Sequence, residues 1–354
     1  MARRATSPTM REIAQRANVS IGTVSRVLNR HEDVDEKLRD RVESIARKVG
    51  YEFSARTRNA VQTKSRIIGL ILLNNPGLSS SQSLMLLGIE EYCSAAGYCL
   101  LFARHQHAAH IAAGHLDAPS IVQTPGLADC LIIAGTVHSN MLQALDNYGL
   151  RYVLLRNHVM EMPEAREYGA LVGYDEVGGC FHATRYLAQL GHRHIWYIGD
   201  ASRPWHRTRL QGYTRAIEEL KLESHVHSIA LCDDEFENGQ AAVSYVLDQG
   251  WPMTAILAES DQLAFGCREG LRQHRREVPK DVSMIGFEYE AGRGHASNLT
   301  SISVDMVEVG RQLAKAAIAQ IENHQKEPVN VMVPATLVKR STCRPMRTDE
   351  HMML

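Results

Sequence analysis

The stretch that decides the fold of the N-terminal part is residues 9–29, TMREIAQRANVSIGTVSRVLN. Its small and apolar positions fit two short amphipathic helices better than one long helix. Asn18 is expected to end the first helix, because asparagine tolerates the left-handed backbone of a tight turn. Ser20 then caps the second helix with its hydroxyl. The positions expected to be buried are Ile13, Ala14, Ala17, Val19, Val24, Val27 and Leu28.

A third helix follows at once. Asp35 is its expected N-cap and Gly50 its stop. Leu38, Val42, Ile45 and Ala46 recur between them at helical spacing. Helix, short turn, helix and a supporting helix is the layout of the helix-turn-helix motif, whose second helix enters the major groove of DNA.

The exposed face of the second helix has the side chains that such a role requires. Arg26 can donate two hydrogen bonds to guanine O6 and N7, and Ile21 can contact a thymine methyl. The other positions on this face are small and polar, which lets a helix lie deep in the groove. The candidate DNA contacts of this helix are Ser20, Ile21, Gly22, Thr23, Ser25, Arg26 and Asn29. A small helical hairpin without a ligand is the alternative.

The charge distribution agrees with a DNA-binding N-terminus. The chain of 354 residues has a formal net charge of −1, yet residues 1–66 hold 15 Lys and Arg against 8 Asp and Glu. The remainder holds 24 against 32. Such an asymmetry indicates a basic module for a polyanion joined to an acidic body, although a solvated charged face is the plainer alternative.

Longer blocks of the sequence carry a resemblance to a known family. VSIGTVSRVLN (19–29) followed by DVDEKLRDRVESIARKVGY (33–51) resembles the headpiece of the lactose repressor/galactose repressor family of bacterial regulators. IIGLIL (67–72), LAQLGHRHIWYIG (187–199), AESDQLAFGCREGL (258–271) and VPKDVSMIGFEYE (278–290) resemble later blocks in family order. LTSISVDM (299–306) and TLVKRST (336–342) continue the match. The resemblance covers essentially the whole chain.

The resemblance implies a hinge that folds on DNA and inserts a leucine pair into the minor groove. Here Ala60 stands at the wedge position with Val61 beside it, and Phe53 replaces the usual proline. Arg56 and Arg58 add charge, so phosphate contact or arginine in the minor groove is expected in place of a deep wedge. Further candidate DNA contacts are Thr9, Tyr51, Ser54, Thr57, Arg58 and Ala60.

The body alternates apolar runs with amphipathic stretches, which predicts parallel sheets covered by helices on both faces. Nine or more strands are too many for one compact sheet of this topology, so two lobes are expected. The expected strands are 67–73, 98–103, 130–134, 152–155, 170–174, 194–199, 228–231, 254–258 and 282–287. The expected helices include 84–95, 177–190, 207–220 and 261–273.

The fold class is therefore an all-α helix-turn-helix headpiece joined to an α/β two-lobed effector domain with doubly wound parallel sheets. The resemblance implies that this domain is similar to periplasmic sugar-binding proteins. We expect the headpiece over residues 1–52, the hinge over 53–65, the effector and dimerisation domain over 66–345, and a short tail over 346–354.

In such folds ligands lie beyond the carboxyl ends of the strands, here between the lobes. By the resemblance, Arg209 holds the effector and Asp261 is the facing carboxylate, a pairing suited to sugar hydroxyls. Trp205 can stack on a pyranose and Phe236 can close over it. An ordinary ion pair for the first two and ordinary core packing for the aromatics are the alternatives. The candidate effector contacts are Asn74, Ser81, Gln82, Arg156, Trp205, Arg209, Phe236, Asp261 and Glu288.

Other site classes find little support. His105, His107, His110 and His115 lie close in sequence, but His105 and His107 do not share a helical face, and no cysteine or carboxylate pair completes a metal set. We therefore expect no metal and no cofactor. No GxSxG, Walker or HExxH motif is present, so we expect a protein that is not an enzyme. A metal- or redox-responsive regulator, or a small-ligand-binding protein without a repressor role, remains the alternative.

The remaining expectations concern location and partners. Seven scattered cysteines without a CxxC spacing indicate reduced thiols. We expect no signal peptide and no membrane span, and hence a cytoplasmic location. One headpiece binds too weakly to be specific alone, so we expect a homodimer on a palindromic operator. Only nine residues follow Pro345, too few for the leucine-heptad tail that makes the lactose repressor a tetramer.

Overall fold

The computed structural model describes residues 10–20, 23–24, 27, 35–48, 64–75, 77–124, 126–147, 151–160, 170–200, 204–228, 232, 234–288, 298–322 and 329–346. The chain divides into two compact units, Met1–Ile67 with Ser120–Asp129, and Ile68–Pro119 with Cys130–Leu354. The fold class predicted from the sequence is confirmed, while the proposed domain boundaries remain predictions.

The N-terminal helices form where the capping signals predict. Helix α1 (Met10–Ala17) is followed by Asn18 at φ 52°, the left-handed conformation expected of it. The Ser20 hydroxyl accepts a hydrogen bond from the Thr23 N–H at 3.0 Å. Helix α3 (Glu36–Lys48) begins after Asp35, whose carboxylate accepts from the Leu38 N–H at 3.1 Å. These local bonds satisfy amides that helix starts leave without partners.

A small apolar core joins these helices. Thr23, Val24 and Val27 are helical. Leu28 lies outside the described residues. The other apolar positions expected to be buried in the first two helices, and those of the third helix, belong to this core or pack against it. The buried members are Ile13, Ala14, Ala17, Val24, Val27, Val42 and Ala46, with Val19, Leu38 and Ile45 packed against them.

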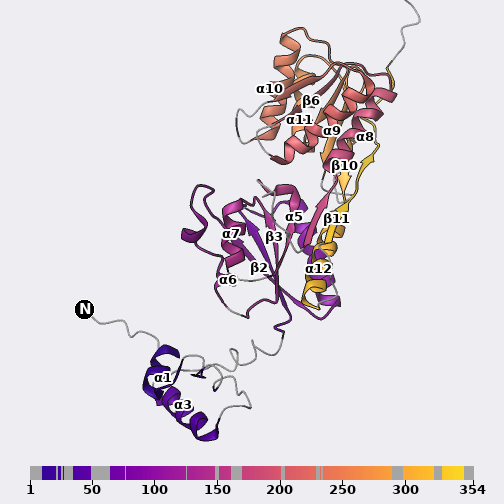
Figure 1. The fold of residues 1–354 in the computed structure, drawn as a ribbon. Coiled ribbons are helices and arrows are strands. Elements are labelled where there is room, and N and C mark those ends of the chain that lie inside the picture. Colours follow the sequence, from indigo (N-terminus) through magenta and orange to yellow (C-terminus); the bar gives the residue numbers. More distant parts are fainter. Residues whose placement is uncertain are drawn as a thin grey trace, which may run out of the picture. The chain divides into compact units, whose positions relative to one another are not determined.

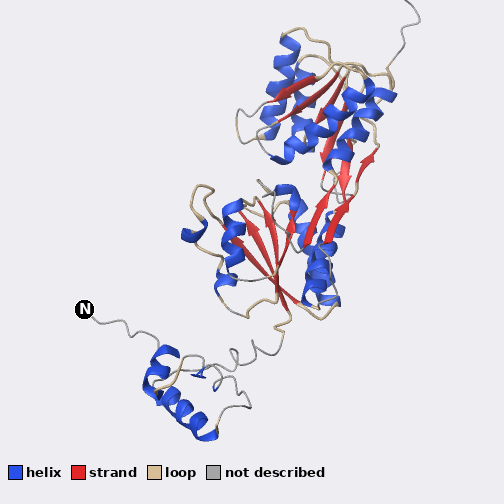
Figure 2. Cartoon of the chain, in the orientation of Figure 1, coloured by secondary structure: helices blue, strands red, loops and turns tan. Residues whose placement is uncertain are grey.

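The rest of the chain forms two six-stranded sheets (Figures 1 and 2). The first sheet has the order β11-β5-β4-β3-β1-β2, and the second has the order β12-β10-β9-β8-β6-β7. The first contains β1 (Ile67–Leu73), β2 (Cys99–His105), β3 (Cys130–Gly135), β4 (Tyr152–Leu155), β5 (Ala170–Tyr174) and β11 (Val329–Val333). The second contains β6 (Ile195–Gly199), β7 (His225–Ser228), β8 (Ala255–Ala258), β9 (Ser283–Glu288), β10 (Thr300–Val304) and β12 (Ala335–Val338).

Neighbouring strands pair in parallel throughout β11-β5-β4-β3-β1 and β10-β9-β8-β6-β7, whereas β12 is antiparallel to β10. The helices of this unit and of residues 120–123 are α5 (Ser80–Ala95), α6 (Ser120–Gln123), α7 (Ser139–Asn147), α8 (Glu176–Gln189), α9 (Pro204–Leu220), α10 (Glu235–Asp248), α11 (Asp261–Gln273) and α12 (Met306–Ile321). Two 3₁₀ turns, Ala113–His115 and Arg156–His158, lie after β2 and β4.

Strand β6 shows how the second sheet is covered on both faces. Ile195 and Tyr197 pack in one core with residues of α8 and α9, such as Leu187 and Ile217. Trp196 and Ile198 point to the other face, where they pack with residues of α10 and α11. Alternation along a strand sends successive side chains to opposite faces, so a run buried on every residue needs helices on both sides, as predicted.

The start of one strand was missed. The sequence analysis expected a strand at 228–231, of which only Ser228 is described, and Ser228 ends β7 (His225–Ser228), which begins three residues earlier than predicted. Strand β7 lies at the end of the strand order, and its side chains are alternately half-buried and exposed. Its polar sequence HVHS therefore gives a weaker signal than the apolar run that follows it. The strands β10, β11 and β12 were also missed.

Candidate functional site

Arg209 of α9 lies at the centre of a buried polar network at the carboxyl ends of the strands. Its side chain is 1% exposed, and its Nε donates to Glu176 Oε1 at 2.8 Å. Its guanidinium stacks over the Phe287 ring, 4.1 Å from the centroid, and Nη1 donates to the Glu259 carbonyl at 2.5 Å. Burial opposes the charge on Arg209, but the Glu176 carboxylate, together with Tyr174 and Tyr197, favours it, and the pKa of the guanidinium is raised. Arg209 is charged in the folded protein.

Glu176 connects this arginine to strands β4 and β5 of the first sheet. It occupies the first turn of α8, directly after β5, and Asp175 caps that helix. Its Oε2 accepts from Thr208 Oγ1 at 2.9 Å and from Asn157 Nδ2 at 3.1 Å. Asn157 also holds the backbone of Tyr174, donating to its carbonyl and accepting from its N–H. One carboxylate thus joins groups that follow strands β4 and β5 to α9.

His158 and Tyr174 extend the network. The Tyr174 hydroxyl lies 3.2 Å from His158 Nε2. Burial lowers the pKa of His158 to about 4, with smaller opposing and supporting effects from Glu176 and from Arg209. Burial also raises the pKa of Tyr174 well above its usual value. Both groups are therefore neutral at pH 7 and can exchange hydrogen bonds with uncharged hydroxyls.

Glu259 is a second buried carboxylate at the end of a strand. It follows β8 and is 2% exposed. Its Oε2 lies 2.9 Å from His206 Nδ1 and accepts from the Asp200 N–H at 2.6 Å. Gly199 permits this approach, because a Cβ there would lie 2.3 Å from the carboxylate.

Asp261, the carboxylate expected to face Arg209, is half-buried in the first turn of α11. It accepts a hydrogen bond of 2.6 Å from Ser301 Oγ. A Cβ on Gly286 would lie 2.1 Å from its Oδ1, so the glycine leaves room for this side chain. Phe236, at the start of α10, is half-buried, and its N–H donates to Asp234. The carboxylate bound to Arg209 is Glu176, which the sequence analysis did not single out.

The candidates of the first sheet have structural contacts. Asn74 follows β1 at φ 50°, accepts from the His107 N–H at 2.8 Å and donates to the Thr136 carbonyl at 3.2 Å. It therefore ties together the chain after β1, β2 and β3. Gln82 forms a capping box with Ser79 at the start of α5, and the Ser81 hydroxyl lies 2.9 Å from that of Ser79.

The remaining candidates are either exposed or lie largely outside the described residues. Arg156 is exposed in the turn after β4, and its stem covers Gly173. Trp205 belongs to α9 and Glu288 ends β9, but their side chains lie outside the described residues. Of the DNA-binding candidates, Ser20 and Thr23 are described, their hydroxyls 2.8 Å apart. The others lie outside the described residues: Thr9, Ile21, Gly22, Ser25, Arg26, Asn29, Tyr51, Ser54, Thr57, Arg58 and Ala60.

Comparison with known proteins finds two family matches along the chain. Residues 9–54 match the family "Bacterial regulatory proteins, lacI family", and residues 184–343 match a "Periplasmic binding protein-like domain". The chain therefore carries a domain of the lacI family of regulatory proteins, followed by a periplasmic binding protein-like domain. The first match spans the helix-turn-helix, and the second spans all six strands of the second sheet together with α9, α10, α11 and α12.

Known transcriptional repressors align with almost the whole chain. The ribose operon repressor of Haemophilus influenzae is 27% identical over 338 residues, 94% of this chain and 98% of its own. The repressor CytR of Escherichia coli is 28% identical over 346 residues, 96% and 97% of the two chains. These relatives are transcriptional regulators.

Solved structures of the lacI family show the same fold. A complex of the regulator CelR with cellobiose is 25% identical, has a TM-score of 0.65, and covers 95% of this chain and 99% of its own. A lac repressor dimer bound to operator DNA is 19% identical with a TM-score of 0.64, covering 96% and 100%. Among the described residues, no helix is long and apolar enough to cross a membrane.

Proposed function

We propose that this chain is a sequence-specific transcriptional repressor that binds a palindromic operator as a homodimer and is controlled by a sugar-like small molecule. The observation that supports this best is the lacI match over residues 9–54, where α1, the Asn18 turn and the Ser20 cap have the layout of a helix-turn-helix and α3 is its supporting helix. The protein is not an enzyme under this proposal, and it acts in the cytoplasm.

The Arg209 network supports a polyhydroxylated effector. The Glu176 and Asn157 side chains, which follow β5 and β4, form a hydrogen-bonded chain to one guanidinium, which also contacts the Glu259 carbonyl after β8 and the Phe287 ring of β9. Ligands of parallel α/β sheets bind at this end of the strands. A site rich in fixed donors and acceptors selects ligands that carry hydroxyls and rejects analogues that lack them. The names of the ribose repressor and of the CelR–cellobiose complex point to the same class of ligand.

The nine candidates Asn74, Ser81, Gln82, Arg156, Trp205, Arg209, Phe236, Asp261 and Glu288 remain our proposal for the effector contacts, to which we add Glu176 and His158. The boundaries 1–52, 53–65 and 66–345 likewise remain our proposal for headpiece, hinge and effector domain.

The proposal is tested in two steps on the purified full-length chain. Selection from random duplexes is expected to return a palindrome, bound by a dimer in sedimentation analysis. A thermal-shift screen of sugars, phosphorylated sugars and nucleosides is then expected to find a ligand, because a ligand at 100 times its dissociation constant adds about 2.7 kcal/mol of stability. That ligand should change operator affinity, and Asp261→Asn should remove the response while leaving operator binding intact. Selection without any enriched sequence would overturn the DNA-binding proposal.

A response of operator binding to metal ions or to oxidation, with no response to any sugar, would favour a metal- or redox-responsive regulator. A thermal shift with a sugar, combined with no sequence selected from the random duplexes, would favour a small-ligand-binding protein without a repressor role.

A further inference from the structure

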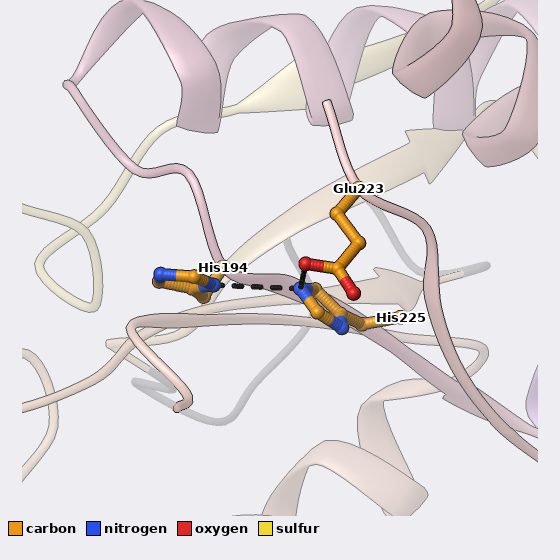
Figure 3. Close-up of side chains that lie close together, drawn as sticks. All are labelled: His194, Glu223 and His225. Atoms are coloured by element: carbon orange, nitrogen blue, oxygen red, sulfur yellow. Dashed lines mark hydrogen bonds and ion pairs between the residues drawn. The ribbon is translucent and has the colours of Figure 1, made fainter. Parts of the chain in front are cut away.

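Three side chains of the kinds that bind metal ions meet at the amino ends of β6 and β7. His194 directly precedes β6, His225 begins β7, and Glu223 lies in the connection between α9 and β7. His194 Nδ1 lies 3.4 Å from His225 Nε2, and Glu223 Oε2 lies 3.8 Å from the same Nε2. The three ligand atoms all lie within 4.8 Å of one another (Figure 3).

These separations match a tetrahedral ion. Two nitrogens bound to zinc at about 2.0–2.1 Å stand about 3.3 Å apart at the tetrahedral angle, close to the separation of the two imidazole nitrogens. The Glu223 oxygen lies 3.8 Å from His225 Nε2 and within 4.8 Å of His194 Nδ1, so tetrahedral coordination requires it to approach these nitrogens by about 0.5 Å and by up to about 1.5 Å. Its side chain is 77% exposed and hence unconstrained by packing. Two histidines and one glutamate with water in the fourth position is an established donor set for zinc.

The backbone around both histidines is fixed by buried partners. The Tyr213 hydroxyl accepts from the His225 N–H at 2.9 Å and lies 2.8 Å from the Ile195 carbonyl. The His194 carbonyl accepts from the N–H groups of Thr254 and Ala255. Tyr213 is fully buried. Backbone held in this way lowers the entropy that a bound ion would otherwise have to remove.

Aromatic packing sets the plane of the His225 ring. Trp196 stacks on it with 5.0 Å between centroids and 19° between planes. Trp251 in turn stacks on Trp196 with 5.6 Å between centroids.

We propose that His194, Glu223 and His225 form a binding site for a divalent transition-metal ion, with zinc as the ion that the donors fit best. The site would tie β6, β7 and the α9–β7 connection together at the edge of the second sheet. It lies at the amino ends of these parallel strands, whereas the Arg209 network lies at carboxyl ends, so it is separate from the proposed effector site. The sequence analysis considered histidines 105–115 and expected no metal; parallel pairing brings together two histidines that stand 31 positions apart.

The test uses the full-length chain, stripped of metal with a chelator that is then removed. Zinc titrated by calorimetry is expected to show a site that is lost in His194→Gln and in His225→Gln. Glu223→Gln changes an exposed side chain and cannot unfold the protein, so its expected effect, a loss of affinity of roughly tenfold or more, is free of folding artefacts. Cobalt in place of zinc should give the visible absorption of a tetrahedral ion, and copper should quench the fluorescence of the adjacent Trp196.

His227→Gln is the matched control. His227 lies two positions along the same strand and on the same face, stacked on Tyr245 with 4.9 Å between centroids, but outside the three-residue cluster. It should bind zinc as the unchanged protein does. Equal zinc stoichiometry and affinity in the unchanged protein, Glu223→Gln and both cluster histidine variants would overturn the proposal. So would quenching by copper that persists in His225→Gln. Operator binding is measured in parallel, and its loss or retention bears on the repressor proposal alone.

Discussion

Arg209 Nε and Glu176 Oε1 lie 2.8 Å apart, and each side chain is 1% exposed. A buried charge is tolerated only when it is paired and hydrogen-bonded, and this pair meets both conditions through Thr208, Asn157 and the Glu259 carbonyl. The pair joins the start of α8 to α9. It thereby places the arginine at the carboxyl ends of the strands, where a ligand is expected.

Glu176→Gln should destabilise the chain by about 3–5 kcal/mol, because it leaves the buried guanidinium of Arg209 without its counter-charge. Chemical denaturation followed by tryptophan fluorescence measures the change. Glu219→Gln is the control, since Glu219 pairs with Arg185 at 3.6 Å with both side chains about half exposed. Removing that pair should cost no more than about 1 kcal/mol. Equal effects of the two substitutions would refute the structural role of the Arg209–Glu176 pair.

Stability should fall between about pH 6.5 and pH 4, in part because of His158. Burial lowers its pKa to about 4 in the folded chain, so in this interval the unfolded chain binds a proton that the folded chain does not. The contribution of His158 to the free energy of unfolding is therefore fully present above the unfolded pKa and is lost as the pH falls toward 4. His158→Gln should remove this contribution, so that the free energy of unfolding falls less steeply between pH 6.5 and pH 4. The difference from the unchanged protein should be on the order of 3 kcal/mol or less. The exposed His182, replaced by Gln, is the control and should leave the profile unchanged.

Local signals explain what could be predicted from the sequence. Strands β1, β4 and β5 and helix α11 have the predicted bounds, because each is a dense apolar run or an amphipathic stretch that begins after a capping residue. Asn18, Ser20 and Asp35 were predicted from side-chain chemistry that acts within three residues. Such effects need no knowledge of the rest of the chain.

Long-range packing explains what was missed. Glu176 and Glu259 look in sequence like ordinary polar residues after a strand, and only the packing of α9 against them makes them buried partners of Arg209 and His206. Strand β7 was misplaced because an edge strand carries little apolar signal. His194 and His225 meet only through the parallel pairing of β6 with β7.

Ser20→Ala should weaken the headpiece by about 1 kcal/mol, because the Thr23 N–H loses the hydroxyl that caps it. Protease sensitivity of the headpiece without DNA is the measurement, since it does not depend on any contact of Ser20 with the operator. Ser20→Thr retains a capping hydroxyl and should restore most of the resistance. Equal protease sensitivity of the alanine and threonine variants would show that the loss of resistance does not come from the missing cap.

Arg26→Ala should weaken operator binding and relax sequence choice by about 1–3 kcal/mol if Arg26 reads a base edge. The measurement is the ratio of affinities for the selected operator and for random duplex at fixed salt. A phosphate contact would instead lower both affinities equally and reduce the salt dependence. An unchanged ratio therefore removes Arg26 from the base-reading residues.

The hinge gives the last prediction. Small side chains at Ala60 and Val61 bury less surface in an opened base step than a leucine pair does. At about 0.8 kcal/mol per buried CH₂, two leucines would supply several methylenes toward the few kcal/mol of unstacking. Arg56 and Arg58 attract phosphates, but that attraction falls with salt and carries no sequence information. We therefore expect a shallow operator bend and a steep salt dependence of operator affinity.

Ala60→Leu should tighten binding to an operator with a central pyrimidine–purine step and increase the bend, measured by fluorescence transfer across the operator. Ala60→Ser, which adds no apolar surface, is the control. A sharp kink already present with Ala60, and unchanged by leucine, would show that the bend does not depend on an apolar wedge at this position.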